Sequence, residues 1–226
     1  MSKKKLFLIH NHKNFSGAAR SLGETIINLK KKIEFVVICP KGSSSKFFKS
    51  LKIDVMEVSL VPRFNHFELG YYKGLRWLLI IRELIALVYF LFFLIKLKFK
   101  YNDIKKFHLN EIELSIVAPL LKFFFDTTVT SHLRSPLEIN KGKNRYKILN
   151  LLCKKYINRI IAIDNDCYKT SPIKKITYII YNGINYKNLF KKKKKRKIIT
   201  FGFLGNFIER KGIYETLEVF KKINKK

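Results

Sequence analysis

The chain has 226 residues, and 47% of them are hydrophobic, so a real core is available in one large domain or two small ones. It carries 47 Lys and Arg against 16 Asp and Glu, a formal net charge of +31, which would suit an anionic membrane face or a nucleic acid. Because the lysines are scattered along the whole chain and no nucleic-acid-binding module is recognisable, we expect ordinary surface lysines and no nucleic-acid partner.

Short apolar runs and amphipathic stretches alternate along the chain, which predicts an α/β fold with a parallel, doubly wound sheet. Helical patterns, such as Glu113–Phe124 and Asn144–Tyr156, lie between the apolar runs. The runs that predict strands are Lys4–Ile9, Glu34–Cys39, Ile53–Val58, Ile104–Leu109, Thr127–His132, Arg159–Ile163 and Thr177–Tyr181.

The turn after the first predicted strand carries small residues. Ser16–Leu22 reads SGAARSL, and small side chains at a strand-to-helix turn let a ligand approach the backbone. The run lacks a full G-x-G-x-x-G, so it does not support a dinucleotide site. A tight turn without a ligand explains the same residues, and both interpretations stay open. His10 and His12 fit loop histidines better than a metal pair, because no acidic or cysteine partner stands nearby.

The segment Trp77–Leu97 is strongly apolar and contains the uncharged run Leu84–Ile95. A membrane-spanning helix needs about 20 apolar residues, and the pair Arg82 and Glu83 would lie inside the bilayer. We therefore predict a long helix that packs on the sheet and whose far end can contact a membrane face, in preference to a transmembrane helix.

Polar residues emerge where predicted strands end. His108 lies at the end of the fourth strand, and His132 and Arg134 emerge together from the fifth. Ligands bind at the carboxyl edge of parallel sheets, where Arg can bind phosphate and His can relay protons, so His132 and Arg134 are site candidates. A hydrogen-bonded strand-end histidine is the alternative for His132. Asp164 and Asp166 fit helix capping better than metal binding.

The last part of the chain begins with Lys191–Lys197, which is entirely basic and predicts an extended linker. Ile199–Leu204 predicts a buried strand, Gly205 a sharp turn, and the apolar spacing from about Lys211 a helix. Free N–H groups at that helix N-terminus, with the charges of Arg210 and Lys211, predict an anion site.

The run from Gly205 to Phe220, GNFIERKGIYETLEVF, resembles the opening of the donor domain in family-4, retaining GT-B glycosyltransferases. Asn206 departs from the pattern, since the family usually has Arg there. The SGAARSL turn and the run from Asn182 to Phe190 resemble two further family segments. The residues that match the donor-domain pattern in register are Gly205, Lys211, Gly212, Leu217 and Phe220.

The resemblance implies transfer of a sugar from a nucleotide-sugar donor to a glycan or lipid-linked acceptor in cell-surface polysaccharide synthesis. It implies retention at the anomeric carbon, no metal and no cofactor. It places His132 beside the transferred sugar as the catalytic residue, and Arg134 and His108 at the acceptor. The residues implied to hold the donor diphosphate are Lys211, Arg210, Asn206, Gly205 and Gly17.

The expected domains are a GT-B N-terminal, acceptor-side Rossmann-like domain over residues 1–190, the basic linker 191–197, and the first strand and helix of a donor domain over 198–226. A lone strand and helix cannot close a Rossmann-like domain, because their apolar faces lack partners. We therefore expect a fragment, a truncated product or a chain completed by another polypeptide, with little or no transferase activity alone.

Cysteine usage and the N-terminus bear on the compartment. Cys39, Cys153 and Cys167 lack metal-ligand spacing, and the apolar run Leu6–Ile9 is too short for a signal-peptide core. We expect a cytoplasmic protein that can contact the inner membrane face peripherally. The alternative function is a non-enzymatic, basic module that binds membrane surfaces.

Overall fold

The computed structural model describes residues 4–64, 74–137, 143–183, 202–204 and 212–223. The chain divides into two units, residues 1–185 and 186–226. The described part of the first unit contains the sheet and six α-helices, and that of the second contains one helix, α7 (Ile213–Ile223).

A seven-stranded parallel sheet forms the centre of the first unit, in the order β3-β2-β1-β4-β5-β6-β7. All seven strands predicted for the first 190 residues are confirmed, with bounds that shift by at most two residues. The strands are β1 (Lys4–Ile9), β2 (Ile33–Pro40), β3 (Asp54–Val58), β4 (Lys106–Leu109), β5 (Thr128–Leu133), β6 (Arg159–Ala162) and β7 (Thr177–Ile179).

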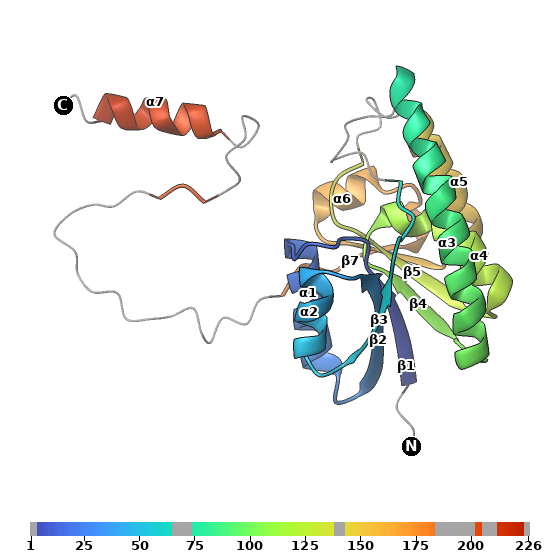
Figure 1. The fold of residues 1–226 in the computed structure, drawn as a ribbon. Coiled ribbons are helices and arrows are strands. Elements are labelled where there is room, and N and C mark those ends of the chain that lie inside the picture. The colour runs from blue at the N-terminus through green and yellow to red at the C-terminus, as the bar shows by residue number, and fades with distance from the viewer. Residues whose placement is uncertain (1–3, 65–73, 138–142, 184–201, 205–211, 224–226) are drawn as a thin grey trace. The chain divides into compact units, whose positions relative to one another are not determined.

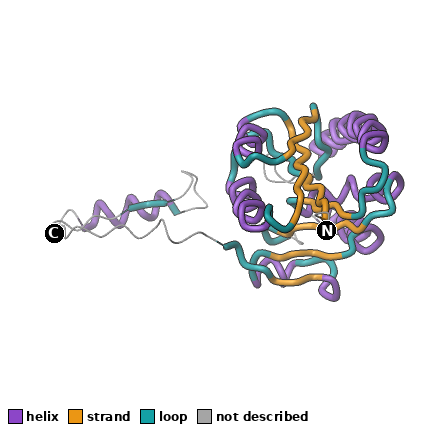
Figure 2. The backbone as a smooth tube through the Cα atoms, turned by 90° about the horizontal axis from the view of Figure 1, so that it is seen from below, coloured by secondary structure: helices purple, strands orange, loops and turns teal. Residues whose placement is uncertain are grey.

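Helices cover both faces of the sheet (Figures 1 and 2). On one face lie α1 (Gly17–Leu29) and α2 (Ser43–Ser50). The helices on the other face are α3 (Leu79–Lys100), α4 (Ala118–Phe124), α5 (Lys143–Tyr156) and α6 (Asn165–Thr170). Short 3₁₀ helices span Gly74–Leu78, Ile112–Val117 and Lys174–Ile176.

Strands at the centre of the sheet divide their side chains between two cores. In β1, Phe7 and Ile9 pack into the core under α3, α4 and α5, whereas Leu8 packs with Leu22 and Phe48 under α1 and α2. Because both faces are buried, the strand reads as a continuous apolar run rather than an alternating one.

The predicted helix Glu113–Phe124 is divided in the structure. Residues Ile112–Val117 form a 3₁₀ helix, and the α-helix α4 begins only at Ala118. Pro119 stands in the first turn of α4. Proline has no N–H to donate and clashes with the carbonyl four residues earlier, so it starts an α-helix well but cannot continue one.

The long helix α3 packs on the sheet as predicted, but only with one side. Glu83, Ala86, Phe90, Leu94 and Leu97 are buried against the core. Among the described residues, no helix has the length and apolar composition needed to cross a membrane. The opposite side of α3 leaves large apolar side chains exposed, namely Ile81, Leu84, Ile85, Val88, Tyr89, Phe92 and Phe99.

The second unit corrects one prediction. Residues 202–204, the described part of the predicted strand Ile199–Leu204, belong to no strand, and Leu204 is fully exposed. A strand needs a neighbouring strand for its backbone hydrogen bonds, and sequence periodicity cannot supply one. The predicted helix is confirmed as α7, preceded by Gly212 with φ +72°.

Candidate functional site

The strand order reverses at β1, since β2 and β3 lie on one side of it and β4 to β7 on the other. In doubly wound sheets ligands bind beside the carboxyl ends of the strands at such a switch point. Here the two residues that follow β1 and β4, His10 and Asn110, meet at the switch point. Their side chains are both fully buried, and Asn110 Nδ2 lies 2.9 Å from His10 Nδ1.

Arg134 fixes how Asn110 is oriented. Its Nη2 donates to Asn110 Oδ1 at 2.7 Å, and its Nε donates to the Asn110 carbonyl oxygen at 2.9 Å. Because Oδ1 accepts from Arg134, the amide nitrogen of Asn110 must face His10 and donate to Nδ1. His10 therefore carries its proton on Nε2, which is buried and has no hydrogen-bond partner among the described residues.

The remaining donors of Arg134 are also engaged by the protein. Nη1 donates to Ser21 Oγ at 3.2 Å and to Asn182 Oδ1 at 3.5 Å, which ties the end of β5 to α1 and to the segment after β7. Burial lowers the pKa of Arg134, and nearby Glu111 opposes that shift. The predicted contact of Arg134 with an acceptor remains a prediction; in this structure the guanidinium holds the polar cluster together.

His108 and His132 form a direct pair. His108 Nε2 lies 2.8 Å from His132 Nδ1, and Arg134 Nη2 lies 3.4 Å from the same nitrogen. Arg134 can only donate, so His132 Nδ1 accepts, His108 Nε2 donates, and the His132 proton resides on Nε2. Burial lowers the pKa of His132 to about 2, helped by His108 and Arg134, and lowers that of His108 to about 4. Both rings are therefore neutral near pH 7.

This arrangement determines what His132 can do chemically. A ring nitrogen that carries a proton, on a ring that resists further protonation, donates a hydrogen bond but is a weak general base. The two histidines line a groove of about 400 Å³ between α1 and the open face of the sheet, which also includes Leu22, Ile161 and Asn182. The groove thus offers a neutral N–H donor beside apolar walls.

Gly17 is the first residue of α1, where Ser16 caps the helix by accepting a hydrogen bond from the Ala19 N–H at 3.4 Å. A Cβ added to Gly17 would meet no atom within 4 Å. The backbone at Gly17 is therefore accessible, and its contact with a phosphate remains a prediction. The other predicted diphosphate ligands lie outside the described residues; they are Gly205, Asn206, Arg210 and Lys211.

No metal site emerges from the described residues. No group of three or more His, Cys, Asp or Glu side chains there has an arrangement that could hold an ion. Asp164 accepts a hydrogen bond from the Cys167 N–H at 2.7 Å, which confirms the predicted helix cap.

Sequence reasoning missed a carboxyl group beside the polar cluster. Glu111 directly follows Asn110, and burial together with nearby Glu113 raises its pKa to about 8, against the effect of Arg134. It is therefore mostly protonated near pH 7. The signal in the sequence was its place directly after Asn110, just beyond the end of β4.

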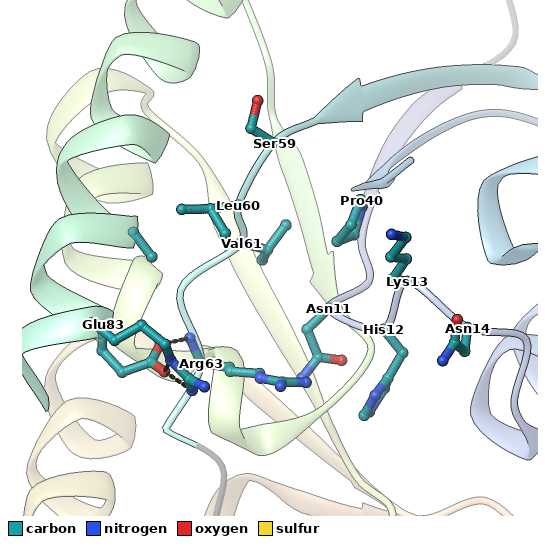
Figure 3. Close-up of a pocket in the computed structure, with 12 residues that line it drawn as sticks. Asn11, His12, Lys13, Asn14, Pro40, Ser59, Leu60, Val61, Arg63 and Glu83 are labelled. Carbon is teal, nitrogen blue, oxygen red and sulfur yellow. Dashed lines mark hydrogen bonds and ion pairs between the residues drawn. The ribbon is translucent and has the colours of Figure 1, made fainter. Parts of the chain in front are cut away.

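A second pocket lies at the carboxyl ends of β1, β2 and β3, beside α3 (Figure 3). We call it the β1–β3 pocket, and it measures about 290 Å³. None of the predicted site residues lines it. Its lining consists of Asn11, His12, Lys13, Asn14, Pro40, Ser59, Leu60, Val61, Arg63, Arg82, Glu83 and Ala86.

Comparison with known proteins places the fold. No family model and no curated protein sequence matches the chain. The crystal structure of Anabaena HepE in complex with UDP-glucose matches 80% of this chain and 44% of its own, with 13% identity and a TM-score of 0.56. HepE in complex with UDP and glucose matches 80% of this chain and 45% of its own, with 13% identity and a TM-score of 0.57. A glycosyltransferase from Rickettsia africae matches 82% of this chain and 44% of its own, with 13% identity and a TM-score of 0.49.

The fold is thus α/β of the GT-B type, with a Rossmann-like N-terminal domain and a second unit that contributes one described helix. At 13% identity the likeness to HepE concerns the fold alone. The chain spans less than half the length of the HepE structures that it matches.

Proposed function

We propose that the chain is a glycosyltransferase, or part of one, that moves a sugar from a nucleotide-sugar to a glycan or lipid-linked acceptor. The observation that carries the proposal is the match of 80% of the chain to HepE, which was crystallised with UDP-glucose. The buried polar cluster at the carboxyl ends of β1, β4 and β5 supports it, because that is where ligands of such sheets bind.

The proposed chemistry needs a group that stabilises the leaving diphosphate. Lys211 is the leading candidate, with Arg210 before it in the sequence and Gly205 and Asn206 further upstream, because fixed cations stabilise charge that develops in the transition state. Gly17 would let backbone N–H groups approach the same phosphates. The reaction proposed is transfer with retention, without metal or cofactor, in polysaccharide synthesis.

His132 is proposed to contact the transferred sugar as a hydrogen-bond donor. Its Nδ1 accepts from His108 and Arg134, so Nε2–H is the group left to meet a sugar hydroxyl. A donor held by two neighbours has one fixed direction, which favours orientation of the sugar over proton abstraction.

A titration with UDP-glucose, followed by NMR, tests donor binding. We expect the amide signals around Lys211 to shift in the parent chain and the response to weaken at least about tenfold in Lys211→Ala, because a charge-assisted phosphate contact is lost. Lys221→Ala is the matched control, since Lys221 is exposed on α7 and pairs with Glu218. No response to UDP-glucose, or equal weakening in both variants, would contradict the proposal.

A radiolabelled transfer assay addresses activity. We expect the 226-residue chain alone to show little or no turnover, because its second unit contributes one described helix to a donor site. Steady turnover by the isolated chain would show that expectation to be wrong while supporting the sugar-transfer function itself.

Contact with an anionic membrane surface at the cytoplasmic face is a second candidate function, and α3 is the observation that favours it. Its outer side exposes Phe92 at 60% and Phe99 at 87%, and Lys96, Lys98 and Lys100 stand in the same half of the helix. Apolar side chains flanked by lysines are typical of helices that lie in the bilayer interface.

Vesicle sedimentation tests this contact. Phe92→Ser with Phe99→Ser should reduce binding to phosphatidylglycerol vesicles, whereas Phe123→Ser, which changes an exposed phenylalanine on α4, should not. Equal vesicle binding by the parent, the double variant and Phe123→Ser would indicate that the overall positive charge alone causes binding. That result would contradict a role for α3.

A further inference from the structure

The β1–β3 pocket contains a buried polar side chain without a partner. Asn11 is 4% exposed, and neither its Nδ2 nor its Oδ1 has a hydrogen-bond partner among the described residues. A buried amide left without partners lowers the stability of the folded chain, so native proteins rarely keep one without a reason. Because Asn11 lines the pocket, a ligand there could satisfy both atoms.

The charges around the pocket favour an anion. Among the described residues that line it are three basic side chains, Lys13, Arg63 and Arg82, and one carboxylate, that of Glu83. Glu83 is already committed, since one oxygen accepts from the Arg63 backbone N–H at 2.7 Å and the other accepts from Arg82 Nε at 2.9 Å and also from Arg82 Nη2. In Figure 3 the side chains of Arg63 and Asn11 extend toward each other across the pocket. Among the described residues of the lining, basic side chains therefore outnumber acidic ones beside the unpaired amide.

The loop that presents Asn11 is held in place. The Lys13 carbonyl oxygen accepts from the Ser44 N–H at 3.1 Å, the Asn14 carbonyl oxygen accepts from Ser44 Oγ at 2.7 Å, and the Phe15 N–H donates to Ser43 Oγ at 2.7 Å. These bonds fix the loop to the start of α2. A preorganised loop lowers the entropy cost of binding, which is what a recognition site requires.

We propose that the β1–β3 pocket binds a phosphate group of the acceptor, with Asn11, Arg63 and Arg82 as its contacts. Arginine donors match phosphate oxygens, and an asparagine amide both donates to a phosphate oxygen and accepts from a neighbouring hydroxyl. The ligand class is thus a phosphate next to hydroxyl groups, as in a sugar phosphate or a phospholipid with a polyol headgroup. The inference rests on the proposed function only in identifying this ligand as the acceptor.

Calorimetric titration of the full chain with glucose 1-phosphate tests the pocket. We expect binding by the parent chain, a loss of at least about tenfold in Arg63→Met and in Arg82→Met, and no binding of neutral glucose. Arg20→Met is the matched control, because Arg20 is exposed on α1 and outside the pocket. Equal losses in Arg20→Met and Arg82→Met, or equal binding of glucose, would overturn the proposal.

Asn11→Leu separates a binding role from a structural one. If the amide serves a ligand, the variant loses glucose 1-phosphate binding and keeps or raises the thermal midpoint of the ligand-free chain. A lower midpoint with unchanged binding would show that Asn11 serves the fold and would refute its assignment. If the chain does not bind glucose 1-phosphate at this pocket but still binds UDP-glucose, the pocket assignment is wrong and the proposed transferase function is unaffected.

The same variants distinguish the two sources of phosphate. Binding to phosphatidylglycerol vesicles should fall in Arg82→Met relative to Arg20→Met if the phosphate belongs to a lipid. If only glucose 1-phosphate binding responds to Arg82→Met, the ligand is a soluble or lipid-distal sugar phosphate. Both results support a phosphate pocket, whereas no response of either ligand to Arg82→Met contradicts it.

Discussion

Three histidines, two of them buried and one partly buried, predict a loss of stability in mild acid. Burial lowers the folded-state pKa values of His10, His108 and His132 from 6.5 to about 3, 4 and 2, and Arg134 contributes to all three shifts. Between these values and 6.5 the unfolded chain binds more protons than the folded one, so stability falls as the pH falls below 6.5. Each histidine contributes a loss of about 2 kcal/mol between about pH 7.5 and about pH 5, or about 6 kcal/mol together.

Glu111 acts in the opposite sense. Its folded pKa of about 8 lies above the ordinary value of 4.5, so the folded chain holds more protons than the unfolded one in that window. Acidification over the same interval therefore returns about 3 kcal/mol, which leaves a net loss of about 3 kcal/mol from these four groups. A Glu111→Gln variant lacks this compensation, so its free energy of unfolding should fall by the full histidine contribution of about 6 kcal/mol over the same pH interval.

Urea unfolding at several pH values, followed by circular dichroism, checks this reasoning. The double variant His108→Gln with His132→Gln removes the directly bonded pair together, so the two coupled titrations need not be separated. Its acid-induced change should differ from that of the parent by about 4 kcal/mol, the share of two histidines. An equal loss of stability in acid by the double variant and the parent would contradict the lowered pKa values of the two histidines.

Three further substitutions probe packing and backbone. Arg145→Met should cost about 3–5 kcal/mol in urea unfolding, because the buried Glu113 carboxylate would lose the cation that donates to its Oε1 at 3.0 Å. A cost under about 1 kcal/mol would contradict this. Phe90→Ala should lower the free energy of unfolding by about 3–5 kcal/mol and Phe92→Ala by far less, because Phe90 is fully buried and Phe92 is exposed. Equal shifts of the thermal midpoint in the two variants would be inconsistent with the packing of α3. Gly42→Ala should lower the thermal midpoint, because its Cβ would lie 2.5 Å from a backbone carbonyl oxygen, and an unchanged midpoint would refute that clash.

The sheet could be predicted from the sequence because strands that are buried on both faces consist almost entirely of apolar residues. Strands such as β1 and β2 are covered on both faces, so they appear as unbroken apolar runs between polar turns. The start of α4 near Pro119 could also have been predicted from the sequence, because proline is favoured in the first turn of a helix. The strand predicted at Ile199–Leu204 was wrong in its described part, because apolar composition does not reveal whether a neighbouring strand exists.

The site was only partly predictable, for a different reason. Polar residues at strand ends stand out in the sequence, which is how His108, His132 and Arg134 were chosen. Their partners do not stand out, because contacts such as Arg134 to Ser21 join positions 113 residues apart and depend on how α1 packs. Asn11 gave no signal at all, since an unpartnered amide is recognised only once its burial is known.

The polar groups at the switch point make more sense as a binding site than as a source of stability. His10 Nε2 and both amide atoms of Asn11 are buried without partners among the described residues. At about 1–3 kcal/mol each, three such atoms would forfeit a large share of a folding free energy of about 5–15 kcal/mol. Apolar side chains at positions 10 and 11 would avoid that cost, yet the loop keeps polar ones and is bonded firmly to α2. Asn110 joins His10 to the histidine pair through Arg134, so these polar side chains form one hydrogen-bonded cluster at the carboxyl edge of the sheet, and Asn11 directly follows His10 in the chain.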